Sequence, residues 1–243
     1  MDADLALALS LADLADSLSL PRFRAVDLAV ETKSDLTPVT DADRAVERAL
    51  RERLAAERPD DAVLGEEEGG AAADGRLWVL DPIDGTRNFA RGIPVWATLV
   101  ALEHDGDPVV GVVSAPALGR RWWATRGGGA FADGAAIRVS RIASLDEAAV
   151  CGFAGYRSFA ERAWHIRDFG DFWQHVLVAE GAVEVALDPM LSAWDIPAVA
   201  LVVEEAGGRC TGVDGRRPTD SLVSSNGLLH DEALAALRHT HGL

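Results

Sequence analysis

The sequence predicts an α+β fold in which helices and sheets form layers. Segments with apolar residues at helical spacing alternate with short apolar runs typical of strands. Between residues 96 and 125 the expected strands are separated by turn residues that favour hairpins. Nearly half of the 243 residues are apolar, which is enough for a sizeable core. Repeats and low-complexity linkers are absent from the sequence, so we expect a compact layered domain.

The first half begins with two expected helices. Apolar residues recur at helical spacing over residues 5–18, and Thr40 or Asp41 can cap a second helix that runs towards residue 56. The polar segment between them, residues 31–39, is expected to be a loop. Short apolar runs bounded by Gly, Pro or Asp predict strands at 62–65, 77–80, 96–103, 109–114 and 121–125.

The second half mixes helices and strands more evenly. Pro197 suits the first turn of a helix, where its missing N–H costs nothing, and Gly207 suits the end of that helix. We expect a single domain over residues 1–243, with a break near residue 140 that divides subdomains 1–140 and 141–243. The expected strands are 148–153, 182–187 and 222–225, and the expected helices are 172–180, 195–206 and 231–238.

Composition excludes several partners. The net charge of −16 repels nucleic acid and anionic membranes. Cys151 and Cys210 lack the spacing of a metal site, and a disulfide between them is neither required nor ruled out. The N-terminus has no basic region, and acids interrupt its apolar stretch, which argues against a signal peptide and a membrane span. We therefore expect a cytoplasmic protein.

Residues 81–86 are the most informative stretch. They read Asp-Pro-Ile-Asp-Gly-Thr and follow the apolar strand that ends at residue 80. Gly85 permits a tight turn with exposed backbone N–H groups, and Thr86 can cap a helix or hold a water. A capped turn does not explain Asp81 and Asp84, which repel each other unless a cation lies between them. The stretch predicts a divalent metal that holds a phosphate.

Other acids stand at the ends of expected elements. Glu66 follows the strand that ends at Gly65, and Asp195 begins a late helix. Mg²⁺ prefers carboxylate oxygens and substrate phosphates as ligands. Taken singly, each acid is more often a helix cap or a solvated charge than a metal ligand, so the pattern matters more than any one residue.

Four segments together resemble the inositol monophosphatase family of metal-dependent phosphatases. Residues 78–89 resemble its first signature, and residues 192–208 resemble its second. Residues 65–67 are similar to its Gly-Glu-Glu, and residues 39–47 to its N-terminal helix. The resemblance spans most of the chain and implies the αβαβα sandwich of the inositol monophosphatase and fructose-bisphosphatase type.

The resemblance also implies roles for residues of the first half. Asp43 and Thr86 would orient and deprotonate the attacking water, with Glu66 as a further catalytic group, and the N–H groups of Gly85 and Thr86 would hold the phosphate. Glu67 and Glu68 follow directly, and the family pattern favours Glu66 among the three acids. Two or three Mg²⁺ would bind to Glu66, Asp81, the Ile83 carbonyl, Asp84 and Asp195.

Substrate choice is expected in the second half. Residues 170–181 and 91–102 closely resemble the actinobacterial type of histidinol-phosphate phosphatase. This resemblance implies hydrolysis of L-histidinol phosphate to L-histidinol and phosphate in histidine biosynthesis, and the family suggests a homodimer. An acidic and aromatic pocket suits a cationic, flat alcohol. The expected substrate-binding residues are Gly170, Asp171, Phe172, Glu180 and Asp188, although an aromatic side chain such as Phe172 is more often part of a core.

Three alternatives remain at this stage. An inositol-1-phosphatase or a broad sugar-phosphate phosphatase would use the same metal site. A fructose-bisphosphatase would need further cations, for which Arg157 and Arg167 are available. A catalytically silent metal-binding regulatory protein is disfavoured by the complete set of expected metal and water-activating residues.

Overall fold

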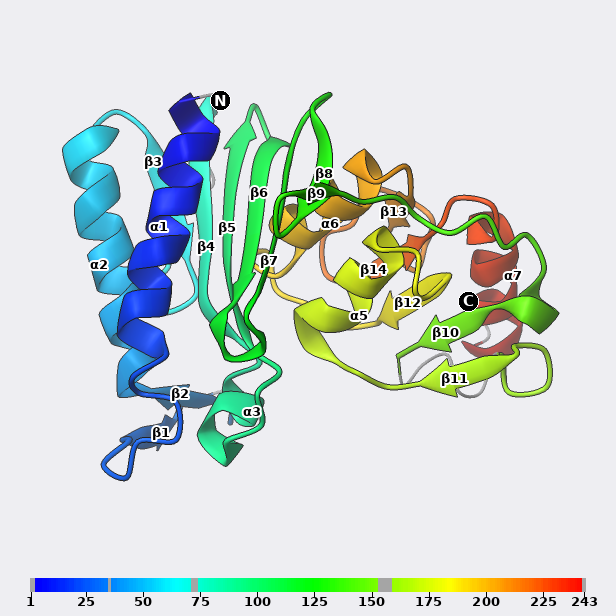
Figure 1. Ribbon diagram of the computed structural model, residues 1–243, viewed down its shortest axis with the longest axis horizontal. Helices are drawn as coiled ribbons and strands as arrows, with labels where there is room; N and C mark the ends of the chain where they lie inside the picture. The colour runs from blue at the N-terminus through cyan, green and yellow to red at the C-terminus, as the bar shows by residue number, and fades with distance from the viewer. Residues whose placement is uncertain (1–2, 35, 71–73, 153–158, 242–243) are drawn as a thin grey trace.

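The elements are stacked in alternating helix and sheet layers (Figure 1). The computed structural model describes residues 3–34, 36–70, 74–152 and 159–241. Its layers follow the order of helix pair, seven-stranded sheet, helix pair, five-stranded sheet and helix. The prediction of a layered αβαβα fold is therefore confirmed.

The first sheet carries the outer helix pair on one face. Helices α1 (Ala3–Ser19) and α2 (Asp41–Glu57) bury leucines one turn apart, such as Leu50 and Leu54, against this sheet. The strand order is β3-β4-β5-β6-β7-β8-β9, with β3 and β4 parallel and the other pairs antiparallel. The strands are β3 (Ala62–Gly65), β4 (Arg76–Asp84), β5 (Ala97–His104), β6 (Asp107–Ala115), β7 (Arg120–Thr125), β8 (Gly129–Ala132) and β9 (Ala135–Ala136).

The second helix pair lies between the two sheets. Helix α6 (Ile196–Glu205) is apolar all round, as expected for a helix covered on every side, and Pro197 lies in its first turn as predicted. Helix α5 (Asp171–Ala179) packs against α6 and the second sheet, and α7 (His230–His241) covers the far face. The second sheet is ordered β11 (His165–Arg167), β10 (Ala149–Cys151), β12 (Val185–Asp188), β14 (Leu222–Ser225) and β13 (Arg209–Thr211).

Several short elements differ from the expected ones. Residues 31–39, expected as a loop, contain an antiparallel hairpin of β1 (Val30–Thr32) and β2 (Pro38–Thr40). Both strands have three residues, and β1 is exposed along its whole length, so the hairpin gives no apolar alternation in the sequence. The helix after residue 85 is α3 (Thr86–Arg91), and two 3₁₀ turns are η1 (Pro116–Leu118) and η2 (Leu145–Glu147).

Some expectations concern residues outside the described part of the chain. Phe153, at the expected end of a strand, and Arg157, the possible cation for a second phosphate, both lie there. Within the described part, Cys151 and Cys210 are free, buried thiols. No helix of the described residues is long and apolar enough to cross a membrane. The single domain with two subdomains stays a prediction.

Candidate metal centre and active site

A bulge in β4 places two acids on one side of the strand. Asp81 lies opposite Leu99 of β5 and Asp84 lies opposite Ala97, so three steps along β4 match two along β5. In a regular strand, residues three apart point to opposite faces. The extra residue reverses this alternation, and Pro82, which has no N–H to donate, stands at the irregularity. The sequence predicted that the strand ends before Asp81; instead both acids lie within β4.

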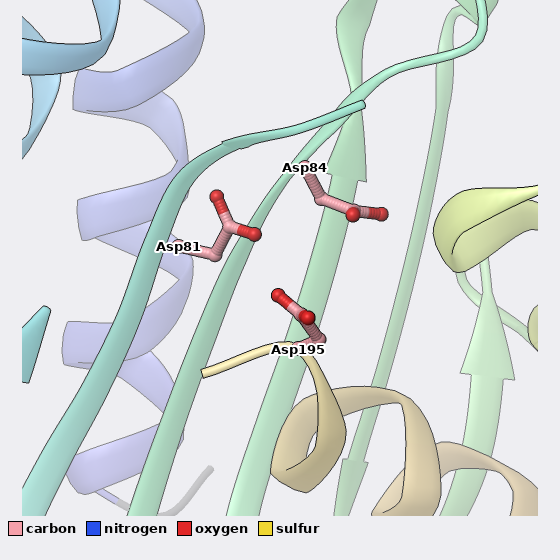
Figure 2. Close-up of side chains that lie close together, drawn as sticks. All are labelled: Asp81, Asp84 and Asp195. Atoms are coloured by element: carbon pink, nitrogen blue, oxygen red, sulfur yellow. The ribbon is translucent and has the colours of Figure 1, made fainter. Parts of the chain in front are cut away.

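Asp195 completes a three-carboxylate cluster. It precedes α6, and the Ser192 N–H donates to its Oδ2 at 2.7 Å. One oxygen from each of Asp81, Asp84 and Asp195 lies within 4.8 Å of the others. Figure 2 shows the three carboxylates directed towards one another from β4 and from the segment before α6.

The cluster lacks positive charge of its own. Burial raises the pKa of Asp81 well above its usual value, and the charges of Glu66 and Asp84 raise it further. Burial also raises the pKa of Asp84 and of Asp195. Asp81 Oδ1 is buried and has no hydrogen-bond partner among the described residues. An orphaned buried carboxylate oxygen among like charges fits a divalent cation, which supplies both the ligand bond and the missing charge.

Glu66 faces this cluster from the turn after β3. Burial is the main cause of its raised pKa, and Asp195 is among the charges that add to it. Lys33 Nζ lies 2.8 Å from Glu66 Oε1 and 2.5 Å from Glu67 Oε1. Glu68 is half exposed and approaches Arg51 instead. Of the three acids in the run, Glu66 is the one whose charge is among the main causes that raise the pKa of Asp81.

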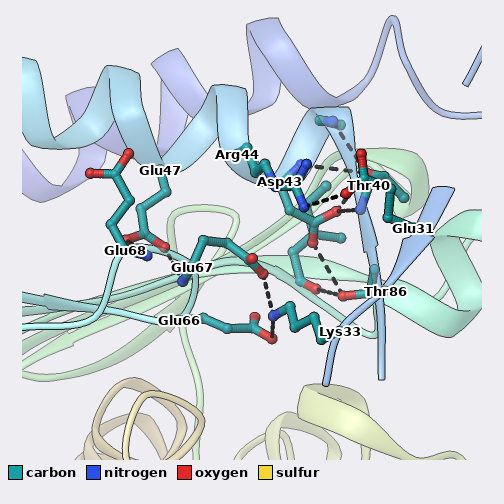
Figure 3. Close-up of polar contacts among 12 residues, drawn as sticks. Glu31, Lys33, Thr40, Asp43, Arg44, Glu47, Glu66, Glu67, Glu68 and Thr86 are labelled. Atoms are coloured by element: carbon teal, nitrogen blue, oxygen red, sulfur yellow. Dashed lines mark hydrogen bonds and ion pairs between the residues drawn. The ribbon is translucent and has the colours of Figure 1, made fainter. Parts of the chain in front are cut away.

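Asp43 and Thr86 form a second polar group beside the cluster (Figure 3). Thr86 Oγ1 lies 3.2 Å from Asp43 Oδ1 and 3.0 Å from the Ile83 carbonyl oxygen. Thr40 donates to Asp43 Oδ2 through its N–H, at 2.8 Å, and its hydroxyl, at 2.5 Å. Burial raises the pKa of Asp43 to about 6. Both Asp43 oxygens therefore have donors, and the aspartate is held in one orientation.

Gly85 begins α3 in a conformation that suits glycine. Its φ is 84°, and a Cβ there would lie 3.0 Å from the Val95 carbonyl oxygen and 3.1 Å from Asp171 Oδ2. The Thr86 side chain does not cap α3, in contrast to one of the two roles considered from the sequence. Its hydroxyl contacts Asp43 and the Ile83 carbonyl instead.

The start of α5 reaches the cluster from the second half. The Phe172 N–H donates to Asp84 Oδ2 at 2.6 Å. The Asn88 amide donates to Asp171 Oδ2 at 2.9 Å, and burial raises the pKa of Asp171 to about 6. Gly170 and Asp171 both have positive φ, 69° and 49°, which is strained for the aspartate. The hydrogen bond from Asn88 holds the Asp171 carboxylate beside Gly85.

The other predicted substrate residues divide into two groups. Asp188 lies at the end of β12. Burial and the nearby charges of Asp171 and Asp195 raise its pKa to about 6. The Phe172 ring is buried in the core against Trp122, so the residue contributes its backbone N–H and not its ring. Glu180 is not brought to the site.

Glu180 lies at the opposite end of α5 from Asp171, about 13 Å away for a helix rise of 1.5 Å per residue. Its carboxylate pairs with Arg120 and accepts the Trp122 indole N–H at 2.8 Å. Both partners come from β7, far away in the sequence. This pairing explains an acid in this position without any contact to substrate.

Sequence reasoning missed three residues at the site. Lys33 contacts Glu66, Asn88 holds Asp171, and Glu47 accepts the N–H groups of Glu67 and Glu68 at 2.7 and 3.0 Å. A signal existed only for Lys33, which is the single lysine of the chain.

Comparison with known proteins agrees with this geometry. The model of the inositol monophosphatase family matches residues 4–243. The chain belongs to this family. It is 54% identical to a histidinol-phosphatase of Mycobacterium tuberculosis, over 96% of this chain and 97% of the relative. It is 46% identical to a histidinol-phosphatase of Streptomyces coelicolor, over 98% of both chains.

Solved structures of the family share the fold. The inositol monophosphatase of Thermotoga maritima superposes with a TM-score of 0.91 at 32% identity, covering 98% of both chains. The inositol monophosphatase family is a group of metal-dependent phosphatases, and the carboxylate cluster of this chain is able to bind a metal. The chain is therefore a phosphatase of this family.

Proposed function

We propose that this phosphatase hydrolyses L-histidinol phosphate to L-histidinol and phosphate, in histidine biosynthesis. The observation that carries the proposal is the pair of acids, Asp171 and Asp188, beside the carboxylate cluster. Burial is the main reason why the pKa of both is raised to about 6; the charge of Asp168 contributes at both residues, while Arg87 lowers the pKa of Asp171. A cationic alcohol relieves this repulsion, whereas a neutral polyol does not. The two relatives named histidinol-phosphatase, each alike over nearly the whole chain, support the same substrate.

We propose Mg²⁺ as the metal, with two or three ions in each site. The proposed ligands are all oxygens, which is the ligand set that Mg²⁺ prefers, and no described thiol lies among them. When bound, Mg²⁺ supplies charge that neutralises the phosphate and lowers the pKa of a water. The proposed ligands are the carboxylates of Glu66, Asp81, Asp84 and Asp195 and the carbonyl of Ile83.

The chain's own groups position the reactants. The Thr86 hydroxyl lies near Asp43, so it can donate to the aspartate and accept a proton from a water, which orients the water for in-line attack. Glu66 would act with this pair as a further proton acceptor. The N–H groups of Gly85 and Thr86 would bind the phosphate at the start of α3. The Phe172 N–H holds Asp84 in place while the ester binds.

Substrate recognition would use the second half. The ammonium of the substrate would meet Asp171, which Asn88 fixes from α3, and the imidazole would lie towards Asp188. Gly170 permits the turn that brings Asp171 to this place. We further propose a cytoplasmic homodimer, on the resemblance to the family.

Phosphate release from a panel of esters tests this proposal. The panel is histidinol phosphate, inositol 1-phosphate, fructose 1,6-bisphosphate and 3′-phosphoadenosine 5′-phosphate, each with Mg²⁺. The proposal expects the highest kcat/KM for histidinol phosphate. A preference for inositol 1-phosphate would instead identify an inositol phosphatase, and release from none of the four would favour a metal-binding protein without catalysis.

A further inference from the structure

Lys33 is the only lysine in the sequence, and every other strongly basic side chain is an arginine. It lies in the connection between β1 and β2, where its N–H donates to the Thr37 carbonyl at 2.8 Å. Its ammonium contacts Glu66 and Glu67 of the turn after β3 (Figure 3). The one lysine of the chain therefore touches a proposed metal ligand.

The contact is partly shielded from water. The side chains of Lys33, Glu66 and Glu67 are 21%, 16% and 6% exposed. Charges in such a place are screened less than those of an exposed pair. Among the described residues, no basic side chain forms an ion pair with Asp81, Asp84 or Asp195. Lys33 is thus the cation that balances the acids at the edge of the cluster.

Glu67 is held at its backbone, and its carboxylate lies closer to the ammonium and is more deeply buried than the carboxylate of Glu66. The fully buried Glu47 accepts the Glu67 N–H at 2.7 Å. Gly65 is required for this approach, because a Cβ there would lie 2.2 Å from Glu47 Oε1. Glu67 can therefore keep the ammonium in place if Glu66 is taken by another cation.

We propose that Lys33 is a built-in counter-ion that exchanges with the metal at Glu66. In the metal-free protein its ammonium neutralises Glu66 and Glu67. When a metal binds the Glu66 carboxylate, the ammonium leaves that residue and stays with Glu67. The inference rests on the assignment of Glu66 as a metal ligand in the proposed function.

The chemistry of the two cations explains the exchange. A lysine ammonium is a compact point charge, and its hydrogen-bond distance of 2.8 Å to Glu66 puts it where a divalent ion would repel it. A planar guanidinium does not mimic a metal ion in this way.

Replacement of the lysine tests the proposal by two readouts that must change in opposite directions. Lys33→Met keeps an unbranched side chain as far as Cε and removes the ammonium with its charge. We expect the stability of the metal-free protein to fall, seen as a lower Tm. We expect the Mg²⁺ affinity to rise, with a dissociation constant on the order of tenfold lower, because the competing ammonium is removed. Calorimetric titration with MgCl₂ measures the affinity without any phosphate ester, so the result is independent of the substrate.

Two variants serve as controls. Lys33→Arg keeps the charge and should bind Mg²⁺ more weakly than Lys33→Met. Arg44→Gln removes a cation that pairs with Glu31 of the same hairpin, and it should leave the Mg²⁺ affinity within about twofold because this pair is exposed. Weaker or unchanged Mg²⁺ binding by Lys33→Met would overturn the exchange, and weaker binding would show that Lys33 orients Glu66.

A further pair of measurements separates the exchange from the ligand assignment. Glu66→Gln should weaken Mg²⁺ binding. Unchanged binding would contradict both the assignment of Glu66 as a ligand and the exchange. Phosphate release by the wild type tests the proposed function independently of this result. Reductive ¹³C-methylation labels Lys33 and otherwise only the N-terminal amine. The methyl resonance of Lys33 in the wild type should shift on Mg²⁺ titration, and an unchanged resonance at saturation would also overturn the exchange.

Discussion

Asp84 is the residue at which the two halves of the molecule meet. Its carboxylate lies close to Asp81 and Asp195, and it accepts the Phe172 N–H from the start of α5. Burial and the charge of Asp171 raise its pKa well above the usual value. The Asp84 side chain is thus both a proposed metal ligand and the acceptor that holds the start of α5. Burying its charge beside other acids costs electrostatic energy.

Asp84→Asn should therefore separate activity from stability. The amide can still accept the Phe172 N–H, but it is a poor ligand for Mg²⁺. We expect kcat to fall by roughly a hundredfold or more, measured as phosphate release with saturating Mg²⁺. Asp60→Asn, at an exposed turn, should leave kcat unchanged. Near-normal activity of Asp84→Asn would contradict the metal assignment.

The same substitution should stabilise the metal-free protein. It removes one of several buried like charges, and 1 kcal/mol corresponds to about 2–4 °C in Tm for a chain of this size. Thermal unfolding in EDTA measures the change. A lower Tm than the wild type would show that repulsion in the cluster is not an important cost.

Where the motif is local, the sequence predicted correctly which residues lie close together in space. The two acids of β4, the Asp43 and Thr86 pair and Asp195 lie near one another, as the resemblance implied. Phe172 and Glu180 could not be placed, since their surroundings depend on the distant strand β7. Lys33 is unremarkable in its local sequence, and its role depends on contacts across 33 residues.

At the scale of elements, α2 organises the site from one face, through residues on successive turns. Thr40 and Asp43 form a capping box at its start, which the sequence predicted in part through Thr40. One turn further, the buried Glu47 pairs with Arg51 and accepts two N–H groups of the turn that carries Glu66. The β4 bulge and the β1–β2 hairpin were not predictable, because both depend on pairing with neighbouring strands.

Glu47→Ala should destabilise the protein and loosen the metal site together. Removing one partner of a buried ion pair costs about 3–5 kcal/mol, and here two backbone N–H groups also lose their acceptor. We expect lower unfolding free energy in urea and weaker Mg²⁺ binding. Glu57→Ala, on the exposed part of the same helix, should cost about 0–1 kcal/mol. Equal effects of the two substitutions would argue against the proposed support of the turn.

At the scale of the whole molecule, one core joins the two sheets through the helix pair between them. A single cluster of buried residues extends from Leu77 and Val79 of β4 through α5 and α6 to Leu222 of β14. The alternation of helical and strand patterns predicted layers of helices and sheets, and the family resemblance implied their αβαβα order. The sheet order follows from pairings that the sequence does not reveal. The shared core supports our proposal of one domain over residues 1–243.

Buried histidines in this core should make the protein sensitive to acid. Burial lowers the pKa of His175 to about 3, and its Nδ1 contacts Ser224 Oγ at 2.9 Å. Between pH 6.5 and 3 the unfolded state binds a proton that the folded state does not, so the unfolding free energy falls as pH falls, by at most about 1.4 kcal/mol per unit. His175→Gln should flatten this dependence in urea unfolding from pH 7 to pH 4.5. A parallel dependence in the variant and the wild type would contradict the neutral buried histidine.

The central claim is that a metal-dependent phosphatase recognises a cationic alcohol through Asp171 and Asp188. The most direct test is kcat/KM for L-histidinol phosphate against its N-acetylated form, with Mg²⁺ and the unaltered protein. Acetylation removes the ammonium charge and leaves the phosphate ester unchanged. A charged hydrogen bond contributes about 1.5–3 kcal/mol, so we expect a loss of about ten- to a hundredfold. Equal kcat/KM values for the two esters would contradict the account.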